Sequence, residues 1–265
     1  MVFAAGRRHR LPVWAVLVLG VLPRCDSAGD EPARTELSIV AASSLTDAFS
    51  ALERGFEARH PNVDVRLDFA GSQVLRLQLE QGAPADVFAS ANENHMRALV
   101  EDHVVERSRT FARNELVIVV PKDNPAAIEC FEDLPRARRL VIGAPSVPVG
   151  LYAERMLDRA AASLGNDFAT RVRRQIVSME SNVRLVRAKV ELGEADAAIV
   201  YRTDALSSNA LDVVPIPRHL NVEASYPIAV VSRSQALALA ERFVEFVLSE
   251  SGQRALVDQG FGAAR

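Results

Sequence analysis

Hydrophobic positions along this chain fall into short apolar runs that alternate with segments of helical periodicity. The run 37–42, LSIVAA, is typical of a short buried strand. Apolar residues then recur at helical spacing, at Leu45, Ala48, Phe49, Leu52 and Phe56. The same order of strand and helix repeats towards the C-terminus, with short polar connections. Such alternation predicts an α/β protein with largely parallel sheets.

The remaining elements are expected from the same two patterns. Strands are expected at 63–69, 86–89, 116–121, 140–143, 197–201, 213–216 and 228–231. Helices are expected at 73–81, 93–101, 150–164, 183–192, 237–248 and 251–259. Turn and capping residues support these boundaries, because Asn182 precedes one helix and Gly193 ends it.

The N-terminal segment differs from the rest of the chain. Basic residues at 7–10 precede an apolar run at 11–23, which is shorter than the about 20 residues that a membrane span needs. With the small residues at 27–29, this pattern predicts a secretory signal peptide, 1–28, followed by a linker, 29–35. Cys25 lies just after the apolar run, so lipid attachment there is left open, although Arg24 precedes it where such sites usually have a small residue. The protein is expected to be exported and periplasmic.

Composition and charge narrow the function. The 265 residues are 49% hydrophobic and 25% charged, which is typical of a globular protein with room for two lobes. The net charge is −3, and no basic block stands out, so no nucleic-acid partner is expected. Two cysteines far apart and five histidines without ligand spacing predict no protein-bound metal and no cofactor.

Four strand-to-helix junctions have an unusual character, at 42–45, 70–73, 147–150 and 181–183. Each starts a helix beside small or amide side chains, and none contains lysine or arginine. A helix N-terminus presents unpaired N–H groups and a partial positive charge, so it binds anions without a cationic side chain. The serines there have no histidine beside them, and neither a nucleophile elbow nor a phosphate-binding loop is present. These junctions favour reversible capture of a small, fully ionised oxyanion over catalysis.

Several motifs in order resemble the periplasmic molybdate-binding proteins of ABC importers, over residues 37–263. The resemblance is carried by AASSLTDAF (41–49), FAGSQVL (69–75), QGAPADVFASA (81–91), VPVGLYA (147–153), SNVR (181–184), GEADAAIVYRTDA (193–205) and YPIAVV (226–231). It implies a two-lobed periplasmic binding protein of type II. Lobe one would hold 36–115 and 227–265, and lobe two 116–226. The ligand would be molybdate or tungstate, delivered by a monomer to a membrane permease.

The resemblance also implies a ligand site. Ser44 and Ser72 match serines whose hydroxyl and main-chain N–H groups hold the oxyanion. Val149 and Val183 match positions that donate only a main-chain N–H, and Tyr201 matches a tyrosine whose hydroxyl closes a tetrahedral site. The metal would be contacted only through the oxygens of the oxyanion.

Neighbouring polar residues have simpler expected roles. Ser43 is expected in a turn, Asn92 as a helix cap, and Tyr152 and Tyr226 as structural residues, with Tyr226 in an extended segment before Pro227. Asp86 and Asp204 are expected to cap element ends. For Arg184 two roles stay open, support of the pocket from behind or a place on a solvated helix face.

Three alternative functions remain at this stage. The nearest is the same fold binding sulfate, phosphate or another small oxyanion. The second is a hydrolase that uses Ser44 or Ser72 as nucleophile. The third is a cytoplasmic ligand-sensing regulator of related fold, which the export signal disfavours.

Overall fold

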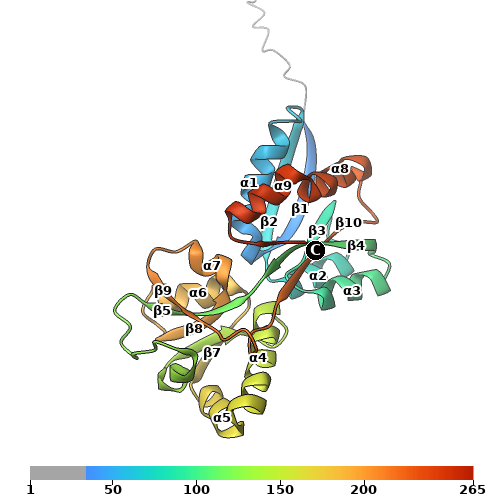
Figure 1. The fold of residues 1–265 in the computed structure, drawn as a ribbon. Coiled ribbons are helices and arrows are strands. Elements are labelled where there is room, and N and C mark those ends of the chain that lie inside the picture. The colour runs from blue at the N-terminus through green and yellow to red at the C-terminus, as the bar shows by residue number, and fades with distance from the viewer. Residues whose placement is uncertain (1–33, 265) are drawn as a thin grey trace, which may run out of the picture. The chain divides into compact units, whose positions relative to one another are not determined.

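A computed structural model describes residues 34–264. The predicted signal peptide, Cys25 and most of the predicted linker lie outside the described residues. Strands and helices alternate through the described part as expected, and they form two sheets with helices packed on them (Figure 1). The α/β prediction is therefore confirmed. No helix within 34–264 has both the length and the apolar character that crossing a membrane requires.

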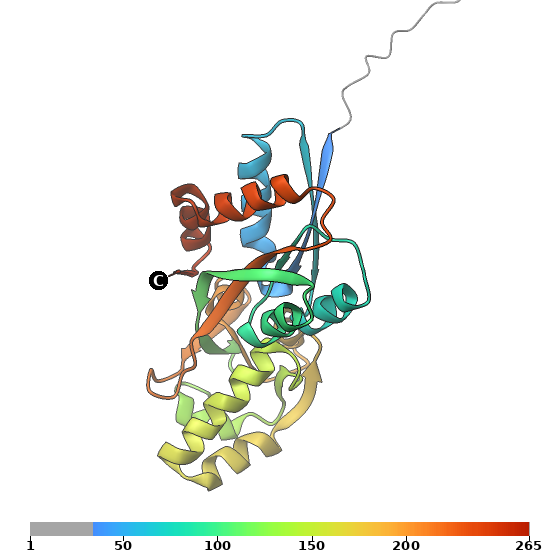
Figure 2. The ribbon, with the colours of Figure 1, turned by 90° about the vertical axis from the view of Figure 1, so that its right-hand side faces the viewer.

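The first sheet has six strands in the order β11-β4-β10-β3-β1-β2. They are β1 (Thr35–Ala42), β2 (Val63–Ala70), β3 (Val87–Ala89), β4 (Val105–Asn114), β10 (Ala224–Val231) and β11 (Gly262–Ala263). Its helices are η1 (Ser43–Leu45), α1 (Thr46–Glu57), α2 (Ser72–Glu80), α3 (Glu93–Glu101), α8 (Leu237–Leu248) and α9 (Glu250–Asp258). Helices α8 and α9 pack beside α1 although they are far from it in sequence (Figure 2).

The second sheet has five strands in the order β7-β6-β8-β5-β9. They are β5 (Leu116–Pro121), β6 (Leu140–Gly143), β7 (Ile176–Glu180), β8 (Ala197–Tyr201) and β9 (Leu211–Pro215). Its helices are η2 (Phe131–Arg136), α4 (Pro148–Leu164), α5 (Asn166–Arg174), α6 (Val183–Glu191) and α7 (Arg202–Leu206). We call the part built on the six-stranded sheet the first lobe and the part built on the five-stranded sheet the second lobe.

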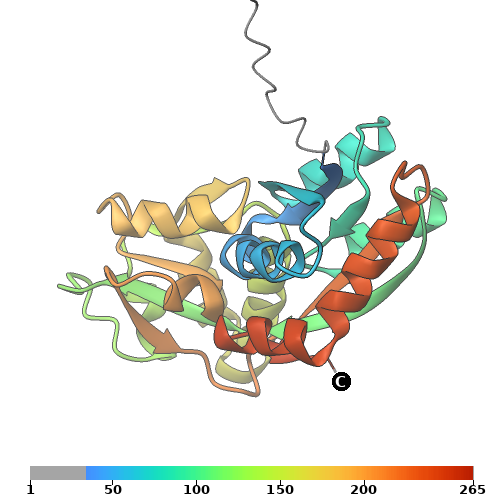
Figure 3. The same cartoon turned by 90° about the horizontal axis from the view of Figure 1, so that it is seen from above.

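The chain passes between the two sheets twice. It leaves the first sheet at the end of β4 and enters the second as β5, in the green segment of Figure 3, and it returns between β9 and β10. We propose on this basis that the first lobe holds 36–115 and 227–265 and that the second lobe holds 116–226. Strand β10 of the first sheet starts slightly before that boundary, at Ala224.

Both sheets are mixed, so the expectation of largely parallel sheets is wrong. Strand β1 pairs in parallel with β2 and β3, and β6 with β7 and β8. The other five pairs are antiparallel, and each involves β4, β5 or β10, the strands next to the crossings. A strand that enters from the other sheet has no crossover helix to return it in the parallel direction.

The elements that the sequence pattern missed are polar or lie at an edge. Strand β4 (VERSRTFARN) has mostly polar residues, and helix α5 carries several arginines. Strand β7 forms an edge of the second sheet. Because these elements are short or poor in apolar residues, they do not stand out as apolar runs or as long amphipathic segments.

Aromatic residues fill the core of the first lobe. Phe49, Phe56, Phe111 and Phe243 are fully buried, and the ring of Phe56 meets that of Phe243 edge-on at 5.2 Å between centroids. Edge-to-face rings add about 0.5–1.5 kcal/mol beyond their buried area. This packing fixes the position of α1 and of the preceding turn η1, whose Ser43 and Ser44 line the site described next.

Candidate functional site

Four helix N-termini meet at one small cavity between the lobes. The structure brings all five residues of the predicted site to its lining, namely Ser44, Ser72, Val149, Val183 and Tyr201. The two serines come from the first lobe and the other three residues from the second. The cavity has a volume of about 10 Å³, close to the space that one water-sized sphere occupies. The lobes must therefore part to admit a larger guest.

The main-chain N–H groups at this cavity belong to the first turns of helices. Ser72 begins α2, Val183 begins α6 and Val149 is the second residue of α4. N–H groups in a first turn have no partner within the helix. Asn182 accepts from the N–H of Leu185 at 3.1 Å, so it caps α6 as expected and leaves the N–H of Val183 free of that bond.

Both serine hydroxyls are oriented by a bond that they accept. Ser72 Oγ accepts from the N–H of Ala91 at 3.0 Å. Ser44 Oγ accepts from the hydroxyl of Tyr226 at 3.2 Å, and that hydroxyl accepts from Asn114 Nδ2 at 3.4 Å. Because each serine oxygen is used as an acceptor inside the protein, its own O–H hydrogen is available to donate to a guest.

The hydroxyl of Tyr201 is a buried donor without a partner. Tyr201 is 1% exposed, and its hydroxyl oxygen accepts and donates no hydrogen bond. Burial, with the neighbouring Tyr226 and Tyr152, raises the pKa of this phenol well above its usual value, so it stays protonated. Leaving a buried polar group unpaired costs about 1–3 kcal/mol. A guest that accepts this hydrogen would remove that cost.

The three tyrosines of the chain form one cluster of edge-to-face rings at the boundary of the lobes. The ring of Tyr201 on β8 meets Tyr226 on β10 at 5.8 Å between centroids and Tyr152 on α4 at 6.4 Å, both edge-on. Tyr226 lies in an extended strand and is not among the residues that line the cavity. This placement agrees with the structural role expected for it.

No charged side chain lines the cavity among the described residues. The nearest arginine in sequence is Arg184, whose Nε donates to Ser43 O at 3.1 Å and whose guanidinium pairs with Asp47. Arg184 belongs to α6 in the second lobe, and both partners lie in the first. Of the two roles left open for it, the solvated helix face does not apply, because Arg184 holds a residue that lines the cavity and bridges the lobes at its edge.

Two further side chains cross the cleft in the same manner. Gln73 Nε2 donates to Ser181 O at 2.8 Å, and His95 Nε2 lies 2.9 Å from Ser146 O. Each of these carbonyls, like Ser43 O, is one to three residues before a predicted site residue. Burial lowers the pKa of His95, so its ring is neutral at pH 7. Local sequence patterns do not predict these bonds, because their partners are 108 and 51 residues apart in the chain.

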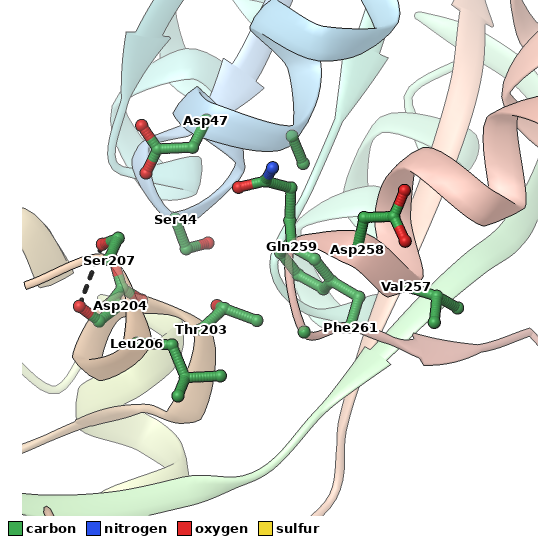
Figure 4. A pocket seen from close by; sticks show the side chains of 12 residues that line it. Ser44, Asp47, Thr203, Asp204, Leu206, Ser207, Val257, Asp258, Gln259 and Phe261 are labelled. Carbon is green, nitrogen blue, oxygen red and sulfur yellow. Dashed lines mark hydrogen bonds between the residues drawn. The ribbon is translucent and has the colours of Figure 1, made fainter.

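A second pocket lies beside the first and shares Ser44 with it. It has a volume of about 170 Å³ and is lined by the start of α1, by α7 and by the segment 257–261 (Figure 4). Asp204 of α7 lines it and is 2% exposed, and neither carboxylate oxygen has a hydrogen-bond partner. The expectation that Asp204 caps an element end is therefore wrong. The expected cap at Asn92 is confirmed, because its side chain accepts from His95 N at the start of α3. Asp86 Oδ2 instead accepts from Ser38 N at 2.8 Å, inside β1, so it joins two neighbouring strands and caps no element end.

The fold and this site define a class of protein. Two mixed α/β lobes joined by two crossings enclose a small cavity lined by neutral hydrogen-bond donors from both sides. This is a two-lobed, type II binding-protein fold.

Comparison with known proteins gives the family. Residues 37–262 match the family model described as bacterial extracellular solute-binding protein. The molybdate-binding protein ModA of Mycobacterium tuberculosis is 38% identical over 258 residues, which cover 94% of this chain and 95% of that protein. The chain therefore belongs to the bacterial extracellular solute-binding protein family.

Solved structures show the same fold. The substrate-binding domain of a putative molybdenum ABC transporter from Clostridium difficile matches with a TM-score of 0.67 and 28% identity, over 87% of this chain and all of that one. The sulfate-binding protein SubI of Mycobacterium tuberculosis matches with a TM-score of 0.78 and 20% identity, over 87% and 88%. The second likeness shows the fold alone.

Proposed function

We propose that this protein binds molybdate or tungstate in the cleft between its lobes and delivers it to an ABC importer in the membrane. The observation that carries this proposal is the set of neutral donors that converge from both lobes on one uncharged cavity. The relatives named for molybdate binding support the choice of ligand. The protein itself is proposed to catalyse nothing, in keeping with its family.

The donor set is sufficient for tight binding. Ser44 and Ser72 would each give an N–H and an O–H, Val149 and Val183 an N–H, and Tyr201 an O–H. If each of these seven contributes about 1.5 kcal/mol to a charged acceptor, the gross gain is around 10 kcal/mol. Closure and lost freedom offset part of this gain. Micromolar to nanomolar dissociation constants correspond to about 8–12 kcal/mol, so the range is within reach.

A site made only of donors selects a fully ionised guest. A monoprotonated phosphate has an O–H of its own, which would meet another donor and remain unpaired in the closed cleft. Sulfate has no such proton, so only its smaller size distinguishes it from molybdate. Sulfate is therefore the second candidate.

Titration calorimetry with molybdate, tungstate, sulfate and phosphate tests the proposal. We expect molybdate and tungstate to bind with dissociation constants at or below about a micromolar, and sulfate and phosphate at least about a hundredfold more weakly. Sulfate binding as tightly as molybdate would replace the proposed ligand. Failure of all four oxyanions to bind would refute an oxyanion function.

Export and transport complete the proposal. We propose that residues 1–28 are a signal peptide and that the protein acts in the periplasm, with Cys25 as an alternative lipid anchor. We also propose that the protein acts as a monomer and that the closed, loaded form is the one that docks on the permease. Mass spectrometry of the exported protein distinguishes cleavage after Ala28 from lipidation at Cys25.

Arg184 is expected to slow ligand release. Replacing it with methionine removes the bridge to Ser43 and Asp47 while keeping a long side chain. We expect molybdate to dissociate about tenfold faster, with little change in the association rate, because the bridge exists only when the lobes are closed. Stopped-flow displacement by excess tungstate measures the rate.

The matched control is Lys189→Met on the same helix, since Lys189 pairs with Glu194 within its own lobe. Its release rate should equal that of the wild type. An unchanged release rate in Arg184→Met would show that the bridge does not hold the closed form.

A further inference from the structure

Asp204 is the one fully buried carboxylate near the cavity that the proposed function leaves unexplained. It lies in the first turn of α7, three residues after Tyr201. Both carboxylate oxygens are inaccessible and accept no hydrogen bond in the described structure. Aspartate is rarely fully buried unless it is paired with another group. The surroundings of Asp204 must therefore explain whether its carboxyl is charged or neutral.

The arginines near Asp204 are engaged with other groups. Arg187 donates to the main-chain carbonyl of Asp204 at 3.1 Å and pairs with Glu191. Arg184 binds Ser43 O and Asp47. Their charges lower the pKa of the Asp204 carboxyl through space, but burial outweighs them and raises it to about 7.

The ionisable groups around Asp204 come from several elements. Helix α6 contributes the two arginines, and the others are Asp47 of α1, Tyr201 of β8, Tyr226 of β10 and the exposed Asp258 of α9. Helix α7 also packs on β5, which has no ionisable residue, and on β9, whose Asp212 pairs with Lys122. The charge of Asp47 raises the pKa of Asp204 further, and burial keeps both tyrosines protonated.

A bound dianion would add two negative charges to the environment of Asp204. Asp204 and Ser44 line the same pocket, and Ser44 also lines the oxyanion cavity. Like charges disfavour ionisation of a buried carboxyl. Water screens little between groups buried this deeply. The loaded protein therefore favours a neutral Asp204 more strongly than the empty protein does.

We propose that Asp204 couples oxyanion binding to a proton: it takes up one proton from solvent when the oxyanion binds and remains uncharged in the loaded protein. This inference rests on the proposed oxyanion function. The proton would enter through the pocket of Figure 4, which Asp204 helps to line. The step balances as carboxylate plus proton to carboxylic acid.

The direction of the pH effect follows from linkage. Below pH 6 the carboxyl is neutral with and without ligand, so affinity does not change there on this account. Above pH 7 the empty protein has lost the proton and must regain it on binding, so affinity falls as pH rises. With a starting value of about 7, the dissociation constant should rise about tenfold between pH 6 and pH 8.

Calorimetric titration of the full protein with molybdate in two buffers of different ionisation enthalpy measures the proton directly. We expect uptake of about half a proton at pH 7, rising towards one at pH 8. In Asp204→Asn, which keeps the size of the side chain, we expect no uptake and a dissociation constant that is independent of pH from 6 to 8. Asp258→Asn is the control, because that exposed carboxyl lines the same pocket, and it should behave as the wild type.

The outcomes separate this inference from the proposed function. Molybdate binding without proton uptake in the wild type would overturn the inference and leave the function standing. Uptake that persists in Asp204→Asn would assign the proton to another group, such as His95, and would also overturn it. No molybdate binding at any pH would overturn the proposed function itself.

Thermal unfolding without ligand tests separately whether Asp204 is a buried, unpaired carboxyl, should calorimetry of the variant give a poor signal. An unfolded aspartate ionises near pH 3.8, whereas folded Asp204 holds its proton to about pH 7. Wild-type stability is therefore lost across that window as pH rises, and Asp204→Asn escapes the loss. We expect the variant to melt at a higher temperature than the wild type at pH 8 and at a similar temperature at pH 4. Equal melting temperatures at pH 8 would contradict an unpaired buried carboxylate.

Discussion

Replacing Gly71 with alanine should weaken molybdate binding by at least about a hundredfold, or about 2.7 kcal/mol, without unfolding the protein. A Cβ atom at this position would lie 2.4 Å from the main-chain oxygen of Ser181, across the cleft. Backbone of the opposite lobe cannot yield as a flexible side chain can, so the lobes would be held apart. Gly71 has φ −64° and ψ 138°, which alanine adopts without strain. The added Cβ would also overlap the side-chain amide of Gln73, but that flexible group can turn away. The main cost therefore falls on closure of the lobes.

Calorimetry for affinity and thermal unfolding without ligand test this expectation together. Gly262→Ala is the matched control, because its Cβ would meet only ordinary contacts at 3.5 Å or more within the first lobe. It should bind as the wild type does. If Gly71→Ala bound molybdate with wild-type affinity, the closed arrangement of the lobes would not be the form that holds the ligand.

The Tyr201→Phe variant should separate affinity from stability. Its hydroxyl has no partner in the protein, so its removal should leave the ligand-free melting temperature unchanged or higher. Its loss from the oxyanion should weaken molybdate binding by about tenfold to a hundredfold, since hydrogen bonds to charged groups contribute about 1.5–3 kcal/mol. Thermal shift with and without molybdate reads both effects in one experiment.

Tyr226→Phe is the natural comparison for that variant. Its hydroxyl joins Asn114 to Ser44, so its removal leaves buried partners unpaired and should destabilise the ligand-free protein by about 1 kcal/mol or more. A Tyr201→Phe variant that destabilised the empty protein as much as Tyr226→Phe, with no loss of affinity, would remove Tyr201 from the binding site.

Local pattern predicted most elements because apolar residues there repeat over several turns or strand positions. Helix α1 and strand β5 are examples, since nearly every apolar residue in them is buried. Strand β4 was not predicted, because its polar residues face solvent and its pairing with β10 is made more than a hundred residues away in the chain. The direction of pairing depends on where the chain crosses between lobes, which local periodicity does not encode.

In the candidate site, too, local features were predictable from the sequence and contacts between distant residues were not. Helix starts with small residues indicated anion binding, and the family resemblance supplied the five positions that line the cavity. Asn114 orients the hydroxyl of Tyr226 through a bond that spans 112 residues, and Gln73 reaches a carbonyl in the other lobe. Such partners become visible only when both lobes are in place. The local sequence around Asp204 favours a capping role. Elements distant in sequence instead bury its carboxylate, and neither oxygen has a hydrogen-bond partner.

The cluster of three tyrosines has a practical consequence for studying this protein. The sole tryptophan is at position 14, so a chain processed after Ala28 contains no indole, and its only phenols are Tyr152, Tyr201 and Tyr226. All three stand where one lobe meets the other. For a chain processed in this way, we expect the near-ultraviolet tyrosine spectrum to report closure of the cleft, so that ligand titrations can be followed without attaching a dye.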